Sequence, residues 1–233
     1  CYKNLFNSFK LDLFVLGDIS EEEITKYADN LMKGFKEENN TVKDLYTKVK
    51  SKEKIVKEKF NSSQSSLVIG LNINKLTEEE RDYKLILYNT ILGCMNNSVL
   101  FVNVREKNSL CYSVGSNISK FTETIIIKSG ISKDNFELAV KLIKESLEEM
   151  KDTKKVNKLI KNAKKTLNLA YNDFYENKGK IIDHYFIREF INMPTIEERR
   201  KKLDDLTAED VTKVANKITV GLIYLLEGKE WKK

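Results

Sequence analysis

Hydrophobic residues follow two different spacings along this chain, and the order of these spacings limits the possible fold more than any other feature. Short runs typical of strands occur at residues 54–60, 65–74, 111–119, 121–132 and 220–228. Apolar residues at helical spacing occupy residues 77–93 and 98–107, and most of the chain from Lys133 to the last strand. This order predicts an α+β domain, with helices packed on one face of a mostly antiparallel sheet.

The beginning of the chain looks like a smaller piece built from the same kinds of element. The segment LDLFVLG, residues 11–17, predicts a buried strand. Ser20 and Glu23 then match a capping box at the start of a helix. The segment at 11–17 resembles the last strand, residues 220–228, which also follows helical residues. We therefore predict residues 1–36 to be the C-terminal remnant of a preceding homologous domain.

The domain boundaries follow from where the periodic spacing stops. Residues 37–52 are polar and show no sustained period, so they predict a linker. Residues 53–233 then form the main domain. The sequence does not begin with Met, and we expect a fragment or a processed product.

Composition excludes several classes of protein. The chain is Lys-rich with a net charge of +6, but the basic run at residues 151–165 lacks interleaved aromatics, so we expect no nucleic-acid partner. No apolar run approaches the ~18 residues of a membrane helix, so we expect no membrane partner. Cys1, Cys94 and Cys111 are odd in number and widely spaced. They predict neither a disulfide framework nor a cysteine zinc site, and a reducing, cytoplasmic location fits them best.

The residues needed for most hydrolytic sites are missing from this sequence. His184 is the only histidine, and a zinc site with one histidine and scattered cysteines is unfavourable. No nucleophile elbow or glycine-rich phosphate loop is present. We therefore expect no metal or cofactor in this fragment, and a lone histidine on an amphipathic helix predicts a surface or boundary residue.

Two side chains remain as candidates, in the stretch LFVNVREKNSLCYSV, residues 100–114. Arg105 lies near the end of the predicted short helix, on the same stripe as Phe101. Tyr112 begins the following strand, and simple alternation places it on the face of Val114. One interpretation is structural, with Arg105 as a solvated helix residue and Tyr112 packed in the sheet.

The motif around these residues resembles the second half of M16 (insulinase-like) zinc metallopeptidases. The family pattern is a helix, a gap and then S-x-L-F-x-x-x-R-E-K-x-x-L-x-Y. The matching residues are Ile91, Leu92, Gly93, Ser98, Leu100, Phe101, Arg105, Glu106, Lys107, Leu110 and Tyr112. The order of elements agrees over about residues 52–233, and the first residues resemble the end of the family's first half. The stretch is also similar to that of the YmfF-like proteins, the non-zinc members of bacterial M16 pairs.

The resemblance implies a LuxS/MPP-like metallohydrolase fold and a divided active site. One half of such a protein carries H-x-x-E-H and zinc, and the other supplies an Arg and a Tyr that reach the substrate backbone. That second role falls on Arg105 and Tyr112. Since this chain has no H-x-x-E-H, we expect the fragment alone to be inactive. Its expected partners are a peptide substrate and a homologous zinc half, in the same parent chain or in a partner subunit.

Two functions stay open at this point. The chain is the substrate-clamping half of a zinc peptidase, or it is a non-catalytic subunit that binds peptide or supports assembly without a role in hydrolysis.

Overall fold

The computed structural model describes residues 12–33, 50–119 and 122–228. The chain divides into two compact units. The sheet unit comprises residues 46–171 and 194–233, and the smaller unit comprises residues 1–45 and 172–193. Most of the predicted linker, residues 37–49 of 37–52, lies outside the described residues.

The sheet unit is built on one mixed sheet of five strands, in the order β1-β5-β2-β4-β3. The strands are β1 (Lys54–Phe60), β2 (Ser65–Ile73), β3 (Cys111–Ser119), β4 (Thr124–Ile131) and β5 (Ile218–Gly228). Only β1 and β5 run parallel, and the other three pairings are antiparallel. The hairpin of β3 and β4 that the sequence predicts is therefore confirmed, and β1 and β3 are the two edge strands.

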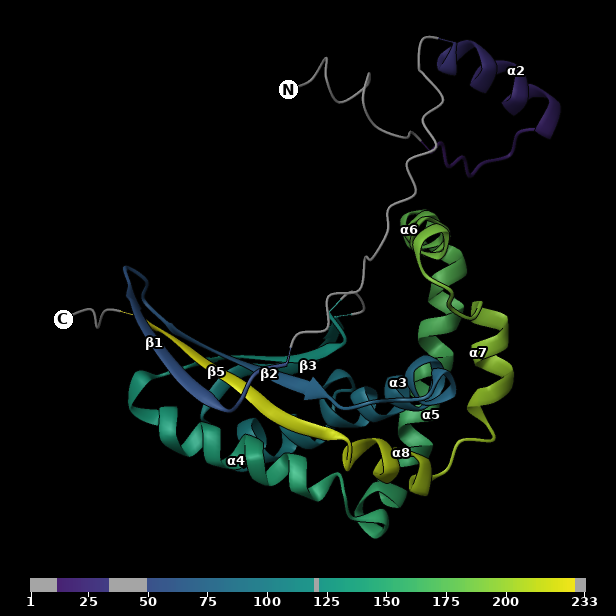
Figure 1. The fold of residues 1–233 in the computed structure, drawn as a ribbon. Coiled ribbons are helices and arrows are strands. Elements are labelled where there is room, and N and C mark those ends of the chain that lie inside the picture. Colours follow the sequence, from purple (N-terminus) through teal and green to yellow (C-terminus); the bar gives the residue numbers. More distant parts are fainter. Residues whose placement is uncertain (1–11, 34–49, 120–121, 229–233) are drawn as a thin grey trace. The chain divides into compact units, whose positions relative to one another are not determined.

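One face of the sheet is buried by helices. Alternate residues of β2 and β4, such as Leu67, Ile69 and Ile127, are fully buried. They lie on the helix-covered face, and Figure 1 shows α4 (Phe136–Glu149), α3 (Leu85–Asn89) and α8 (Ala208–Ala215) on that side. No described helix of the sheet unit covers the opposite face. The α+β class and the one-sided packing predicted from the spacing are confirmed.

The helices begin where the sequence places capping residues. The first long stretch runs from Glu80 to Cys94 as π-helical η1 (Glu80–Lys84), α3, and π-helical η2 (Thr90–Cys94). The short helix η3 (Phe101–Glu106) is also π-helical, and the 3₁₀ turn η4 (Lys133–Asn135) precedes α4. Thr195 and Thr207 form capping boxes at α7 (Ile196–Leu203) and α8. The long helix α5 (Thr153–Glu176) ends inside the smaller unit.

The smaller unit contains α2 (Glu21–Met32) and α6 (Lys178–Phe190). Ser20 caps α2 as predicted. The predicted strand at 11–17 is wrong for its described residues, because residues 12–17 pair with no strand and, except for half-buried Phe14, lie exposed. The surface or boundary position expected for His184 is also wrong. Its ring is buried on α6 and meets the Phe174 ring edge-on at 5.3 Å, because it lies on the packed side of the helix.

A buried polar contact joins the first helical stretch to β3. The Ser116 hydroxyl donates to Asn89 Oδ1 at 2.7 Å, and Asn89 Nδ2 donates to the Ser116 carbonyl at 3.3 Å. The Cys94 thiol donates to the same carbonyl at 3.2 Å. Gly93 permits this approach, because a Cβ there would lie 2.6 Å from the Ser116 backbone nitrogen. The helix end therefore fixes the position of β3, which carries Tyr112.

A second polar contact joins the start of the same helical stretch to the start of β5. Thr77 and Glu80 form the predicted capping box, with the Thr77 amide 2.8 Å from Glu80 Oε2. Lys217 Nζ lies 2.7 Å from both oxygens of Glu80. The hydrogen bond from Lys217 is the main cause that lowers the pKa of Glu80. The carboxylate form of Glu80 is therefore the one that the folded state favours.

We expect Gly93→Ala to destabilise the protein by about 1–3 kcal/mol, the usual cost of overpacking. The added methyl group would meet backbone of β3, which cannot rotate away. Gly70→Ala in β2 is the matched control, because its nearest neighbour would lie at 3.9 Å. Urea unfolding of both variants measures the difference. Equal stabilities would show that the contact at Gly93 does not constrain β3.

We expect Glu80→Gln to lower the free energy of unfolding by about 1–2 kcal/mol at neutral pH, because it removes a charge-assisted hydrogen bond. The pKa of Glu80 is lower in the folded than in the unfolded state. Its contribution is therefore complete above the unfolded pKa and is lost as pH falls through the folded pKa. The difference between wild type and variant should shrink below about pH 4. Exposed Glu78 supplies the control, Glu78→Gln, and a pH-independent difference would contradict this account.

Candidate functional site

The helix that carries Arg105 is held on its inner side by α4. Ser98 begins this helical segment, and its hydroxyl accepts a hydrogen bond from the Phe101 amide at 3.4 Å. Asn103 Nδ2 donates to Ser146 Oγ of α4 at 3.1 Å, in a buried position. The Lys107 amide donates to the Val102 carbonyl at 3.0 Å, the wider π-type spacing that often marks functional sites. The helix is thus fixed on one side, while Arg105 lies half-exposed on the other.

A sharp turn joins this helix to β3. Ser109 has φ 51°, a left-handed conformation that is uncommon for a residue other than glycine. Its amide donates to the Arg105 carbonyl at 2.8 Å, and the Leu110 amide donates to the Val104 carbonyl at 3.1 Å. The turn closes the helix with backbone hydrogen bonds. Because the turn is short, Arg105 at the end of the helix and Tyr112 at the start of β3 lie close together in space.

A β-bulge at the start of β3 turns Tyr112 outward. Cys111 pairs with Ile131 and Val114 with Ser129, so Tyr112 and Ser113 together oppose Gly130 alone. Tyr112 is 81% exposed, whereas Val114 is buried. The predicted placement of Tyr112 on the face of Val114 is therefore wrong, because the extra residue breaks the alternation. The structural interpretation, with Tyr112 packed in the sheet, is wrong for the same reason.

The structure brings the two candidate residues together. The guanidinium carbon of Arg105 lies 5.4 Å from the centre of the Tyr112 ring and 4.8 Å from that of Phe101. These distances are within cation–π range. Neither the guanidinium nor the phenol group makes a hydrogen bond or ion pair with another residue in the described part of the chain. Their donors are therefore free to bind a ligand.

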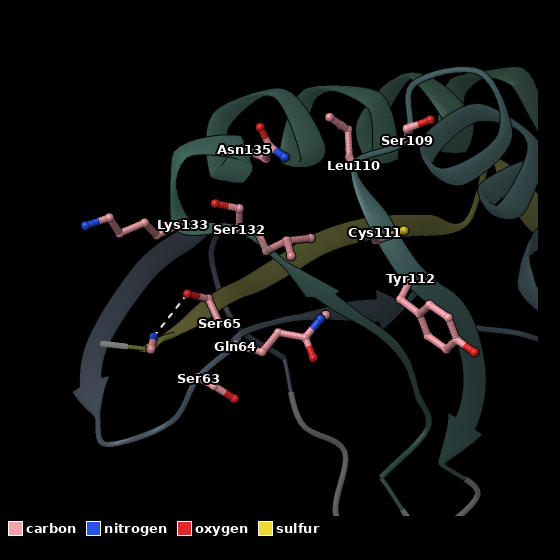
Figure 2. Close-up of a pocket in the computed structure, with 13 residues that line it drawn as sticks. Ser63, Gln64, Ser65, Ser109, Leu110, Cys111, Tyr112, Ser132, Lys133 and Asn135 are labelled. Atoms are coloured by element: carbon pink, nitrogen blue, oxygen red, sulfur yellow. Dashed lines mark hydrogen bonds between the residues drawn. The ribbon is translucent and has the colours of Figure 1, made fainter. Parts of the chain in front are cut away.

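A cavity of about 430 Å³ adjoins Tyr112 (Figure 2). Its walls come from the turn before β2, the turn after η3 with the start of β3, the end of β4 with the turn into α4, and the end of β5. Sequence reasoning missed this cavity. Most of its residues are ordinary serines, glycines and amides, the lining comes from four separate segments, and only the fold brings these segments together.

Metal ligands do not gather in the described residues. Within residues 12–33, 50–119 and 122–228, no group of three His, Cys, Asp or Glu side chains could hold a metal ion. The residues present therefore do not fit a zinc site. Among those same residues, no helix is long and apolar enough to cross a membrane.

Comparison with known proteins shows similarity along nearly the whole chain. The chain is 28% identical over 240 residues to the probable inactive metalloprotease YmfF of Bacillus subtilis, covering 98% of this chain and 54% of that protein. A conserved protein of Enterococcus faecalis V583 has a similar structure, with a TM-score of 0.78 and 26% identity, over 93% of this chain and 52% of that one. This chain thus spans about half the length of these two proteins.

More distant structures share the fold. The peptidase M16 inactive domain from Pseudomonas fluorescens has a TM-score of 0.72 at 21% identity, over 93% of this chain and 53% of that one. The ferredoxin protease FusC, solved in complex with Arabidopsis ferredoxin, has a TM-score of 0.53 at 13% identity, over 77% of this chain and 21% of that one. The family model described as the peptidase M16 inactive domain matches residues 1–167. The chain therefore belongs to the M16 peptidase family, to the part of it described as the inactive domain.

Proposed function

We propose that this chain is the substrate-clamping, non-zinc half of an M16-type peptidase. The observation that carries the proposal is the pairing of two hydrogen-bond donors, in which the guanidinium carbon of Arg105 on η3 lies 5.4 Å from the ring centre of Tyr112 on the edge strand β3. The sequence contains no H-x-x-E-H, and a half without that motif needs another half for hydrolysis. That half lies in the same parent chain or in a partner subunit, and zinc belongs there.

The role proposed for this chain is to bind and orient the peptide. An arginine offers several N–H donors in a fixed plane, and a tyrosine offers one O–H donor. Both fit a peptide carbonyl, and both bind it more strongly as negative charge develops on its oxygen. The ring contact with Tyr112 and Phe101 limits the positions that the Arg105 guanidinium can take. Such preorganisation is what stabilisation of a developing oxyanion requires.

Helix α2 supports the proposed division of the chain. Ile24, Tyr27, Ala28 and Leu31 recur at helical spacing, yet the helix has no buried residue, and Tyr27 and Leu31 are largely exposed. An apolar stripe of this kind normally packs against another element. We propose that residues 1–36 complete a preceding homologous domain, which would cover this stripe.

A second candidate function is peptide binding or assembly without a role in hydrolysis. The name of the Bacillus subtilis relative, a probable inactive metalloprotease, favours this alternative. In both cases the chain binds peptide or a homologous half, and the two functions differ in whether Arg105 and Tyr112 affect turnover. A cytoplasmic location stays a prediction, and the free thiols of Cys94 and Cys111 agree with it.

In the active complex of the full parent protein with its zinc half, we expect Arg105→Ala and Tyr112→Phe each to slow peptide cleavage. Loss of one donor to a developing oxyanion typically costs on the order of 10²–10³ in kcat. We expect the free energy of unfolding to change by less than about 1 kcal/mol, because neither side chain lies in the core. Steady-state kinetics and thermal unfolding of the same preparations measure both quantities.

Arg188 and Tyr185 of α6 form a matched control pair. The Arg188 guanidinium carbon lies 6.0 Å from the Tyr185 ring centre, and Tyr185 is 52% exposed. We expect Arg188→Ala and Tyr185→Phe to leave cleavage unchanged. Full activity in Arg105→Ala would refute the clamp. Unchanged turnover with weakened peptide binding would instead favour the non-catalytic function.

A further inference from the structure

A second cavity, of about 830 Å³, lies beside α4. Its walls come from the last turns of α4 with the turn into α5, the end of α8 with the first residues of β5, and the segment before β1. Figure 1 shows α4 along the sheet and α8 leading into the start of β5. The cavity shares no residue with the one beside Tyr112. Its volume is within the range of roughly 300–1,000 Å³ that is usual for small-molecule sites.

One polar side chain of this cavity is deeply buried and has no partner. Tyr88 of α3 is 1% exposed, and its hydroxyl group makes no hydrogen bond to another residue in the described part of the chain. Among the described residues, Arg199 Nε is the only side-chain nitrogen or oxygen that is both sealed from solvent and without a partner. The Tyr88 oxygen is therefore not sealed. The cavity that Tyr88 lines is where this oxygen can meet a ligand.

The Tyr88 hydroxyl group is a neutral hydrogen-bonding group. Burial raises the pKa of Tyr88 far above its usual value, so the phenol keeps its proton at neutral pH. A phenol in this form can donate one hydrogen bond and can also accept one. Because a buried hydroxyl group without a partner is costly, a ligand with a polar atom at this position would gain a favourable contact.

The other buried residues of the lining are apolar. They are Leu147 of α4, Ala215 of α8 and Ile218 of β5. Val220, one turn of the strand further on, is half-buried. Removing hydrocarbon from water against such walls is favourable. A ligand of this cavity therefore needs an apolar body in addition to the group that meets Tyr88.

The more exposed part of the lining is charged, and each of its lysines is already engaged. The ion pairs join Lys144 to Glu53 at 2.5 Å, Lys151 to Glu148 at 2.5 Å and Lys155 to Glu149 at 3.4 Å. An anionic ligand would have to compete with these carboxylates for the lysines. The lining therefore disfavours an anion.

Two further carboxylates of the lining have no lysine of the lining as a partner. Asp152 accepts hydrogen bonds from the first amides of α5. Glu145 makes no hydrogen bond to another described residue, and its ion pair with Lys141 is exposed and 3.9 Å long. A carboxylate has about four acceptor positions, so Glu145 can accept hydrogen bonds from a ligand cation.

We propose that this cavity binds a small amphipathic amine. The polar group at one end of the ligand bonds the Tyr88 hydroxyl group, the apolar body packs against Leu147 and Ile218, and the ammonium group at the other end meets Glu145. The site uses neither residue of the proposed clamp. It can therefore exist whether or not the chain takes part in hydrolysis.

The first test compares three small ligands on the full parent protein. Tyramine carries a hydroxyl group at one end of an aromatic body and an ammonium group at the other. Phenethylamine lacks the hydroxyl group, and 3-(4-hydroxyphenyl)propionate has an anion in place of the cation. Saturation-transfer NMR titrations give the Kd values. We expect a millimolar Kd for tyramine, usual for a ligand of about ten non-hydrogen atoms, and binding of both other ligands weaker by about twofold or more.

The second test assigns the two ends of the ligand to residues. We expect Tyr88→Phe to weaken tyramine binding about 2–10-fold, the effect of one hydrogen bond, and to leave phenethylamine binding unchanged. Thermal unfolding of this variant should match the wild type, because the hydroxyl group has no partner in the described chain. Glu145→Gln should weaken tyramine binding about 2–5-fold. Exposed Glu137 on the same helix, outside the lining, supplies the control, Glu137→Gln, which should not.

The ligand comparison in the wild type and the Glu145→Gln variant decide the question even without Tyr88→Phe. Absence of tyramine binding at millimolar concentrations would refute the site, as would binding that both variants leave unchanged. Equal affinities for tyramine and the propionate would refute the preference for an amine. Weaker binding in both variants, with normal tyramine binding in Arg105→Ala, supports a site separate from the clamp.

Discussion

Ser116 of β3 and Asn89 of the first helical stretch exchange two hydrogen bonds in a buried position. The arrangement of the candidate site depends on this contact. A buried polar group without a partner is costly, so the two side chains have one favourable arrangement. Gly93 lets the helix end come close enough for the contact to form. The helix thereby determines where the edge strand β3 lies, and Tyr112 is the second residue of that strand.

The backbone is irregular in the segment next to this buried contact between Ser116 and Asn89. The left-handed Ser109 and the bulge at Tyr112 and Ser113 lie between the buried contact at Ser116 and the buried contact at Asn103. Irregular conformations of this kind persist only when the surrounding structure holds them. Here two buried polar contacts, one on each side, hold the segment. The exposed pair of Arg105 and Tyr112 can therefore be ordered even though few atoms cover it.

The sequence predicts the regular parts of this fold well, because they depend on local spacing. The alternation in β2 and the capping boxes at Thr77, Thr195 and Thr207 each involve neighbouring residues, and all appear in the structure. The wrong predictions have non-local causes. A strand at 11–17 needs a partner strand, and none pairs with its described residues.

In the candidate site, too, local features could be predicted from the sequence and non-local ones could not. Arg105 and Tyr112 became candidates through a resemblance, and a period of two residues placed Tyr112 on the wrong face of the sheet. A bulge shifts this period by one residue, and the spacing of hydrophobic residues along the sequence does not reveal it. The cavity beside Tyr112 was missed because four distant segments form it. Its serines and amides have no distinctive pattern until the sheet brings them to one end.

The bulge has a further consequence for the behaviour of the protein at high concentration. An edge strand presents unpaired amide and carbonyl groups, and a regular edge is a template on which copies of the same chain can add without limit. In β3 the pairing is shifted between Cys111 and Val114, so the edge is twisted and locally out of step. A flexible peptide can adjust to such an edge one residue at a time, but a second rigid sheet cannot. The irregularity that exposes Tyr112 to a ligand thus also protects this edge of the sheet against pairing with further copies of the chain.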